Sequence, residues 1–138
     1  MSTPSVLFVC VKNGGKSQMA AGLMRQLAGE AVEVHSAGTA PGTAVNGLSA
    51  QALLEVGVDI TAEVPTPVDY ALARDFDVVV TLGREARLDP LPGITVENWD
   101  TDEPSERGVD GLERMRLIRD DIAARVHRLY STLTDSTP

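Results

Sequence analysis

The residues with the clearest chemical potential lie in one short segment near the N-terminus. Cys10, the only cysteine of the chain, ends the apolar run at residues 6–9 and begins the segment CVKNGGKS, a glycine-rich loop that leads into a helical pattern with Ser17 at its start. A strand, a tight loop and a helix start in this order bring backbone N–H groups together around an anion. A thiol at the base of such a loop faces the positive end of the helix, which favours the nucleophilic thiolate. The segment therefore predicts an anion-binding loop with a reactive cysteine, although an isolated cysteine is more often a buried apolar residue.

The end of the loop, Gly15-Lys16-Ser17, also matches the end of a Walker A nucleotide-binding loop. That template requires a further glycine at the position of Cys10, so nucleotide binding is only a weak alternative. The spacing fits better a loop that wraps one tetrahedral oxyanion directly above the cysteine. Asn13 suits this loop because asparagine tolerates left-handed backbone angles and its amide can hydrogen-bond within a turn. The predicted oxyanion-binding residues are Val11, Lys12, Asn13, Gly14, Gly15, Lys16 and Ser17.

Ser17 has two possible roles in this arrangement. Its hydroxyl can donate a hydrogen bond to the thiolate of Cys10, or it can cap the helix that follows, and the two roles are compatible. We therefore include Ser17 among both the catalytic and the oxyanion-binding residues.

These residues resemble a known family. Cys10, Asn13, Lys16 and Ser17 fall at the positions of the Cys-x-x-Asn-x-x-Arg-Ser loop of the low-molecular-weight protein tyrosine phosphatase superfamily, and residues 35–39 (HSAGT) resemble its Ser-Ala-Gly-Thr segment. The resemblance spans nearly the whole chain. Two positions depart from the family pattern: lysine replaces the loop arginine, and Glu103 replaces the aspartate that precedes a loop proline. With these departures, the run VCVKNGGKSQMAA is most similar to the arsenate-mycothiol transferases, which are single-cysteine arsenate reductases.

The resemblance implies a reaction and its partners. The enzyme would join arsenate to mycothiol as an arseno-mycothiol adduct, which a mycoredoxin later reduces to arsenite. No cofactor would be bound, mycothiol would be the co-substrate, and phosphate or sulfate could mimic arsenate. The thioredoxin-coupled relatives carry two further cysteines after the third strand, and residues 81–90 of this chain contain none. The electrons are therefore expected from an external thiol. A covalent adduct on Cys10 is a hypothesis that the spacing does not decide.

A proton donor is expected in the acidic loop at residues 98–104. Departing oxygen needs a proton, and a carboxyl group near the site can supply it. Glu103 is the first choice because it aligns with the family's aspartate, and the neighbouring Asp102 is the alternative. Asp100 is expected to be solvated. Trp99 either lines the pocket or anchors this loop, and the sequence does not separate the two.

Two other functions compete with arsenate reduction. A tyrosine phosphatase is the leading alternative, but a lysine at position 16 cannot form the bidentate fork that arginine offers to a phosphoryl group. The residues after Pro104, Ser105-Glu106-Arg107, also provide no aromatic ring to pack against phosphotyrosine. A non-enzymatic oxyanion sensor is the third possibility, in which the reactive cysteine and the acidic loop would have no use.

Composition limits the remaining possibilities. The 138 residues, 43% of them hydrophobic, predict one domain over residues 1–138. The sequence has no stretch of transmembrane length and no signal-like N-terminus, and the lone cysteine excludes an internal disulfide, so we expect a cytoplasmic protein.

A net charge of −8 argues against nucleic-acid and anionic-membrane partners. The positive charge that an anionic substrate needs must therefore be local, from Lys12, Lys16, backbone amides and Arg25. The cysteine and two histidines are too widely separated for a metal site. The oligomeric state stays open, with a homodimer as one alternative.

Hydrophobic patterns alternate between strands and helices along the chain. Strands are predicted at residues 6–9, 32–35, 77–82 and 94–97, and helices at 18–29, 48–56, 69–74 and 111–130. This alternation predicts an α/β fold, a three-layer α/β/α sandwich with a four-stranded parallel sheet like that of the low-molecular-weight phosphatases. Ligands of such sheets bind at the carboxyl ends of the strands, where Cys10 lies.

Overall fold

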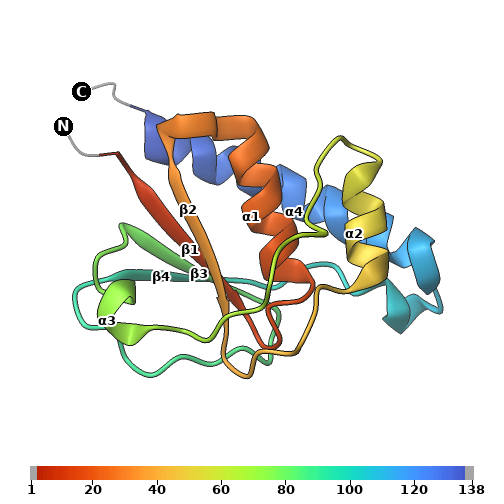
Figure 1. Ribbon diagram of the computed structural model, residues 1–138, viewed down its shortest axis with the longest axis horizontal. Coiled ribbons are helices and arrows are strands. Elements are labelled where there is room, and N and C mark those ends of the chain that lie inside the picture. The colour runs from red at the N-terminus through yellow and green to blue at the C-terminus, as the bar shows by residue number, and fades with distance from the viewer. Residues whose placement is uncertain (1–2, 136–138) are drawn as a thin grey trace.

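The computed structural model describes residues 3–135 and contains a four-stranded parallel sheet with strand order β2-β1-β3-β4 (Figure 1). The strands are β1 (Ser5–Cys10), β2 (Glu33–Gly38), β3 (Val78–Leu82) and β4 (Thr95–Trp99). The α-helices are α1 (Lys16–Ala28), α2 (Gly47–Leu54), α3 (Tyr70–Ala73) and α4 (Gly111–Thr134), and two short 3₁₀ helices are η1 (Gly29–Ala31) and η2 (Pro104–Arg107). The predicted parallel α/β fold is confirmed.

The two central strands are buried along their whole length. All six residues of β1 and all five of β3 are buried, whereas the edge strands β2 and β4 expose part of theirs. Strands covered on both faces have continuous apolar runs without polar alternation, which is the pattern of residues 6–9 and 78–80. The loops that follow β1 and β3 both contribute residues to the pocket described below.

Helices cover the two faces of the sheet unequally. α1, α2 and α4 pack together over one face, around Phe8, Met24 and the buried stripe of α4 (Met115, Ile118, Ile122, Val126 and Leu129). The other face is covered by the single turn of α3 and by loops, with Phe76 and Leu91 against Val79 of β3. Figure 1 shows α3 apart from the three longer helices. On this second face, the helical layer therefore consists of the single turn of α3.

The helix ends differ from the prediction by up to four residues. α1 begins at Lys16, with Gly15 as N-cap and no side-chain cap, so the expectation that Ser17 caps the helix is wrong. α4 continues four residues beyond Tyr130 because Leu133 still packs against the core and Thr134 Oγ1 donates to the carbonyl of Tyr130. No helix within residues 3–135 is both long and apolar enough to cross a membrane.

Candidate active site

The carboxyl ends of β1 and β3 open into a pocket of about 820 Å³, and Cys10 is among the residues that line it. Its walls come from four parts of the chain: the loop after β1, residues 42–49, the end of β3, and the segment from the acidic loop to the start of α4. The charged lining residues are Lys12, Lys16, Arg84, Arg114, Glu85, Glu103 and Glu106. The site therefore lies at the end of the sheet predicted from the strand order.

Backbone hydrogen bonds fix the shape of the loop after Cys10. The carbonyls of Cys10, Val11, Lys12 and Gly14 accept hydrogen bonds from the N–H groups of Thr39, Ala40, Gly42 and Asn46, at 2.7–3.0 Å. The segment after β2 thus holds the carbonyl groups of the loop from outside. On the inner side, the N–H of Asn13 points to Sγ of Cys10 at 3.2 Å. The four carbonyls are thus bonded away from the cysteine, as the predicted anion-binding loop requires.

A glycine at the end of β2 allows the loop to approach this closely. A Cβ atom on Gly38 would lie 2.7 Å from the carbonyl oxygen of Val11 and 3.0 Å from Cβ of Asn13, both inside normal contact distance. Gly38 pairs with Cys10 in the sheet register. The loop after Cys10 therefore packs directly against the Ser-Ala-Gly-Thr segment at Gly38.

Asn13 is the internal anchor of the loop. It is fully buried and has φ = 54°, the one positive φ at a non-glycine residue within 3–135, as its tolerance of left-handed angles predicts. Its side-chain carbonyl accepts from the N–H of Thr66 at 3.0 Å and from Gln18 at 3.3 Å. Neither Gln18 nor Thr66 was predicted to contact the loop. For Gln18, the one signal in the sequence is a polar residue among the apolar residues of α1.

Two polar groups contact the sulfur of Cys10. Ser17 Oγ lies 2.9 Å from Sγ, with either atom able to donate, and the N–H of Asn13 donates to Sγ at 3.2 Å. Asn13 Nδ2 in turn donates to the Ser17 hydroxyl at 2.7 Å. These contacts hold the buried thiol at the base of the loop.

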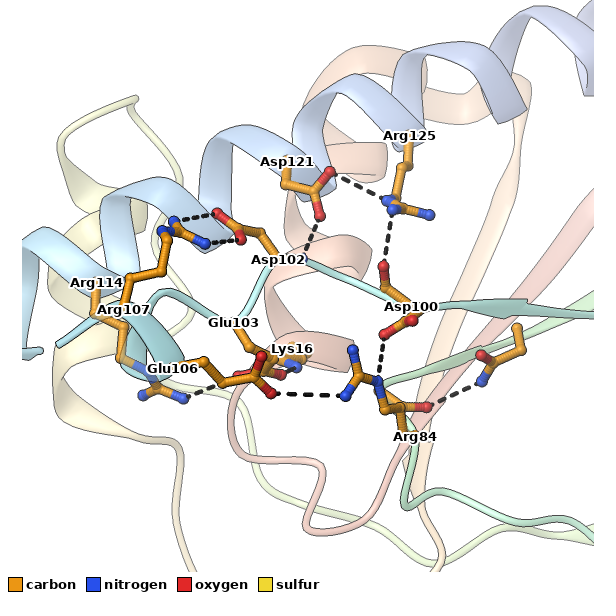
Figure 2. A network of polar contacts seen from close by, with 12 residues as sticks. Lys16, Arg84, Asp100, Asp102, Glu103, Glu106, Arg107, Arg114, Asp121 and Arg125 are labelled. Atoms are coloured by element: carbon orange, nitrogen blue, oxygen red, sulfur yellow. Dashed lines mark hydrogen bonds and ion pairs between the residues drawn. The ribbon is translucent and has the colours of Figure 1, made fainter. Parts of the chain in front are cut away.

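Glu103 reaches the pocket from the acidic loop and forms an ion pair with Lys16 of α1 (Figure 2). Its second oxygen lies 3.5 Å from Nη2 of Arg114, on α4. Glu103 is thus at the pocket, as expected, and its role as proton donor stays a prediction. Arg114 was not foreseen because it is far from the loop in sequence.

Asp102, the alternative donor, is directed to the opposite side. It forms a bidentate ion pair with Arg107 at 2.8 and 3.1 Å and does not line the pocket (Figure 2). The hydrogen bonds from Arg107 lower the pKa of Asp102. Asp100 is exposed, as expected, but pairs with Arg84 at 2.9 Å. Of the three acids, Glu103 is the one at the pocket.

The structure also shows where three other residues named in the predictions lie relative to the pocket. Arg25 lies far from the pocket, where it contacts the carbonyl of Val34 and Glu63, so its predicted contribution to oxyanion binding is wrong. Lys12 lines the pocket as expected. Trp99 is buried against Phe8, with ring centroids 5.6 Å apart, and therefore anchors the loop without lining the pocket.

Sequence comparison connects this geometry with a family. The family model "Low molecular weight phosphotyrosine protein phosphatase" matches residues 5–137, nearly the whole chain. The chain belongs to this family. Curated members similar to it are named for arsenate reduction: arsenate reductase 2 of Staphylococcus saprophyticus is 32% identical over 133 residues, covering 94% of this chain and 98% of the relative. Glutaredoxin arsenate reductase of Synechocystis is 30% identical over 132 residues, covering 94% and 98%.

Solved structures similar to this chain share the fold described above. An arsenate reductase in its phosphate-binding state superposes with a TM-score of 0.83 at 30% identity, covering 95% of this chain and 99% of that one. A thioredoxin-dependent arsenate reductase of Corynebacterium glutamicum gives 0.80 at 32% identity, covering 97% of this chain but only 63% of that longer one. A tyrosine phosphatase of Erwinia amylovora, at 15% identity and a TM-score of 0.80, shares the fold alone.

Proposed function

We propose that this protein is an arsenate reductase that takes its electrons from an external thiol, with mycothiol as the co-substrate. One observation supports the proposal: the only cysteine of the chain is buried at the base of the loop predicted to bind an oxyanion, in a chain whose similar relatives are named arsenate reductases. One of the similar solved structures is an arsenate reductase in its phosphate-binding state, which supports a tetrahedral oxyanion as ligand.

Arsenate would bind in the loop of residues 10–17, with its charge balanced by backbone amides, Lys12 and Lys16. The ammonium of Lys16 now pairs with Glu103, so an incoming oxyanion competes with that carboxylate. Lysine supplies an undirected charge, which suits an oxyanion that has to accept an approaching thiol. Preorganised donors of this kind stabilise charge that develops on the oxygens during attack.

The second substrate has to be a thiol from outside the chain. Reduction of arsenate to arsenite takes two electrons, and the sequence contains no cysteine besides Cys10. The pocket of about 820 Å³ is within the range of sites for small organic molecules and far exceeds one oxyanion. Mycothiol carries many hydroxyls and no carboxylate. Arg84 in the pocket wall is already paired with Asp100 and Glu106, so it is less available to bind a carboxylate of the thiol.

The proposed reaction has two stages. A thiolate sulfur, that of Cys10 or of mycothiol, attacks arsenic and displaces hydroxide, which takes a proton from Glu103 and leaves as water. Where Cys10 attacks first, the thiolate of mycothiol then attacks arsenic and displaces Cys10 as its thiolate. With mycothiol bonded to arsenic, a mycoredoxin thiolate attacks the mycothiol sulfur of the adduct. A disulfide between mycothiol and mycoredoxin forms, the sulfur–arsenic bond breaks, and arsenic keeps the electron pair as arsenite. Such thiols stay reduced in the cytoplasm, where we place the enzyme.

The experiment is arsenite formation by the purified protein with three reductant systems: mycothiol with mycoredoxin, glutathione with glutaredoxin, and thioredoxin with its reductase. We expect turnover with mycothiol and none with thioredoxin alone. Turnover supported by thioredoxin alone would contradict the external-thiol proposal, and turnover with glutathione only would reassign the co-substrate. Cys10→Ser is the negative control because a hydroxyl fits the same space.

Tyrosine phosphatase activity is the second candidate because of the family to which the chain belongs. The pocket, however, has no aromatic side chain in its lining within the described residues. Lys16 also stands where a phosphatase uses the arginine fork. We expect at most weak hydrolysis of aryl phosphates.

A further inference from the structure

Glu103 is shared between two cations that belong to different helices. Its Oε1 pairs with Nζ of Lys16, the first residue of α1, while its Oε2 lies at the longer distance of 3.5 Å from Nη2 of Arg114, on α4 (Figure 2). In this state the carboxylate of Glu103 is paired with the Lys16 ammonium group, to which an oxyanion in the loop would also bind. A bound oxyanion therefore has to displace Glu103 from Lys16.

Arg114 has hydrogen-bonding capacity that this state leaves unused. Its Nε is buried and has no hydrogen-bond partner within residues 3–135. A guanidinium ordinarily holds a carboxylate with two parallel N–H···O bonds, whereas Arg114 makes one long contact with Glu103. The side chain lines the pocket and is 29% exposed, so it has room to turn toward its partner.

We propose that Arg114 is the positioning residue for Glu103. When an oxyanion takes Lys16, Glu103 moves from the ammonium to the guanidinium of Arg114, which then holds it through both Nε and Nη2. The carboxyl group is thereby kept beside the bound oxyanion and is not released to solvent. The proposal rests on the proposed function for the reaction that Glu103 serves, but the exchange itself requires only a tetrahedral oxyanion.

The kinetic test is a double-mutant cycle with arsenate and the thiol system that supports turnover. Arg114→Gln should lower kcat by roughly ten- to a hundredfold, the cost of a misplaced catalytic group, with the KM for the thiol unchanged. In the Glu103→Gln background the same substitution should change kcat by no more than about twofold, since the two residues act as one unit. Arg114→Lys should recover part of the loss. Arg116→Gln, on the same helix but outside the pocket and paired with Glu55, is the matched control and should retain wild-type kcat. Equal losses from Arg114→Gln in both backgrounds would overturn the proposal.

A crystal structure of the wild-type protein with inorganic phosphate tests the exchange without any turnover. We expect Lys16 on the phosphate and Glu103 within hydrogen-bond distance of both Nε and Nη2 of Arg114. A phosphate-bound structure in which Glu103 remains on Lys16, with Nε of Arg114 still unpaired, would contradict the proposal. Failure of arsenate turnover would instead refute the proposed function and leave this structural result to decide the exchange.

Discussion

The hydroxyl of Ser17 lies 2.9 Å from the sulfur of Cys10, in a hydrogen bond buried from solvent. Ser17 belongs to the first turn of α1 and Cys10 to the end of β1, so the contact joins the strand to the helix across the loop. The side chain of Ser17 is therefore hydrogen-bonded to the thiol of Cys10 and does not cap the helix. The N-cap residue of α1 is Gly15.

The first prediction follows from this contact. Cys10 should react with iodoacetamide at pH 6 faster than free cysteine, and phosphate should protect it. Ser17→Ala should slow that reaction by about tenfold or more, the scale of a hydrogen bond to a charged group. Ser131→Ala, an exposed serine on α4, is the control. Equal alkylation rates in wild type and Ser17→Ala would show that the hydroxyl does not stabilise the thiolate.

The two neighbouring acids should behave differently. Glu103→Gln should slow arsenate turnover by roughly a hundredfold or more, as expected on loss of a general acid. Asp102→Asn should have a mild effect, because Asp102 is held by Arg107 outside the pocket. Steady-state kcat of both variants is the measurement. The reverse order would assign the proton donor to Asp102, and near-normal rates in both would mean that water or the thiol provides the proton.

Gly38 should be intolerant of any side chain. Gly38→Ala places a methyl group 2.7 Å from the carbonyl of Val11, so the oxyanion loop has to shift. We expect a loss of about 1–3 kcal/mol in the free energy of unfolding, typical of overpacking, together with weaker protection of Cys10 by phosphate. Gly47→Ala, where a new Cβ meets no atom within 4 Å, is the matched control. Equal stability of the two variants in urea would contradict the close approach.

Stability in acid should depend on Glu55. The hydrogen bond from Arg116, with further help from Arg119, lowers the pKa of Glu55 from 4.5 to about 2 in the folded protein. Below pH 4.5 the unfolded chain takes up a proton that the folded protein does not, so this contribution to stability is complete above pH 4.5 and is lost toward pH 2. Urea unfolding of Glu55→Gln should show a weaker fall in stability across that window. Glu30→Gln, at an exposed carboxylate in η1, should follow the wild type.

The sequence was sufficient for features that depend on local pattern. The apolar runs of β1 and β3 are continuous because both strands are covered on both faces. The position of Cys10 at the end of β1 then locates the loop at the ligand-binding end of the sheet. The side chain of Asn13 behaves as its type predicts, with φ = 54°.

The remaining features depend on contacts between distant segments. Asp102 and Glu103 are adjacent and chemically alike, and only their partners Arg107 and Lys16 decide which one faces the pocket. Arg114 lines the pocket because α4 packs against α1. Arg25 does not, because it lies on the last turn of α1, at the end of the helix away from the loop. No local pattern in the sequence encodes these pairings.

Lys16 should separate the two chemistries that the fold can support. Lys16→Arg restores the planar fork that clamps two oxygens of a phosphoryl group, so it should raise hydrolysis of p-nitrophenyl phosphate. Arsenate turnover should stay the same or fall. Lys16→Ala should weaken arsenate binding by roughly 1.5–3 kcal/mol, the scale of a hydrogen bond to a charged group. Both rates are to be measured in each variant. A Lys16→Arg enzyme that gains no phosphatase activity would show that the fork is not what the wild type lacks.

The most direct test of the central claim is a comparison of two rates in the wild-type protein. One is kcat/KM for arsenate with mycothiol and mycoredoxin, measured as arsenite formed, and the other is kcat/KM for hydrolysis of p-nitrophenyl phosphate. We expect efficient thiol-dependent formation of arsenite, abolished in Cys10→Ser, and little hydrolysis. Efficient hydrolysis without thiol-dependent formation of arsenite would contradict it and make the protein a phosphatase.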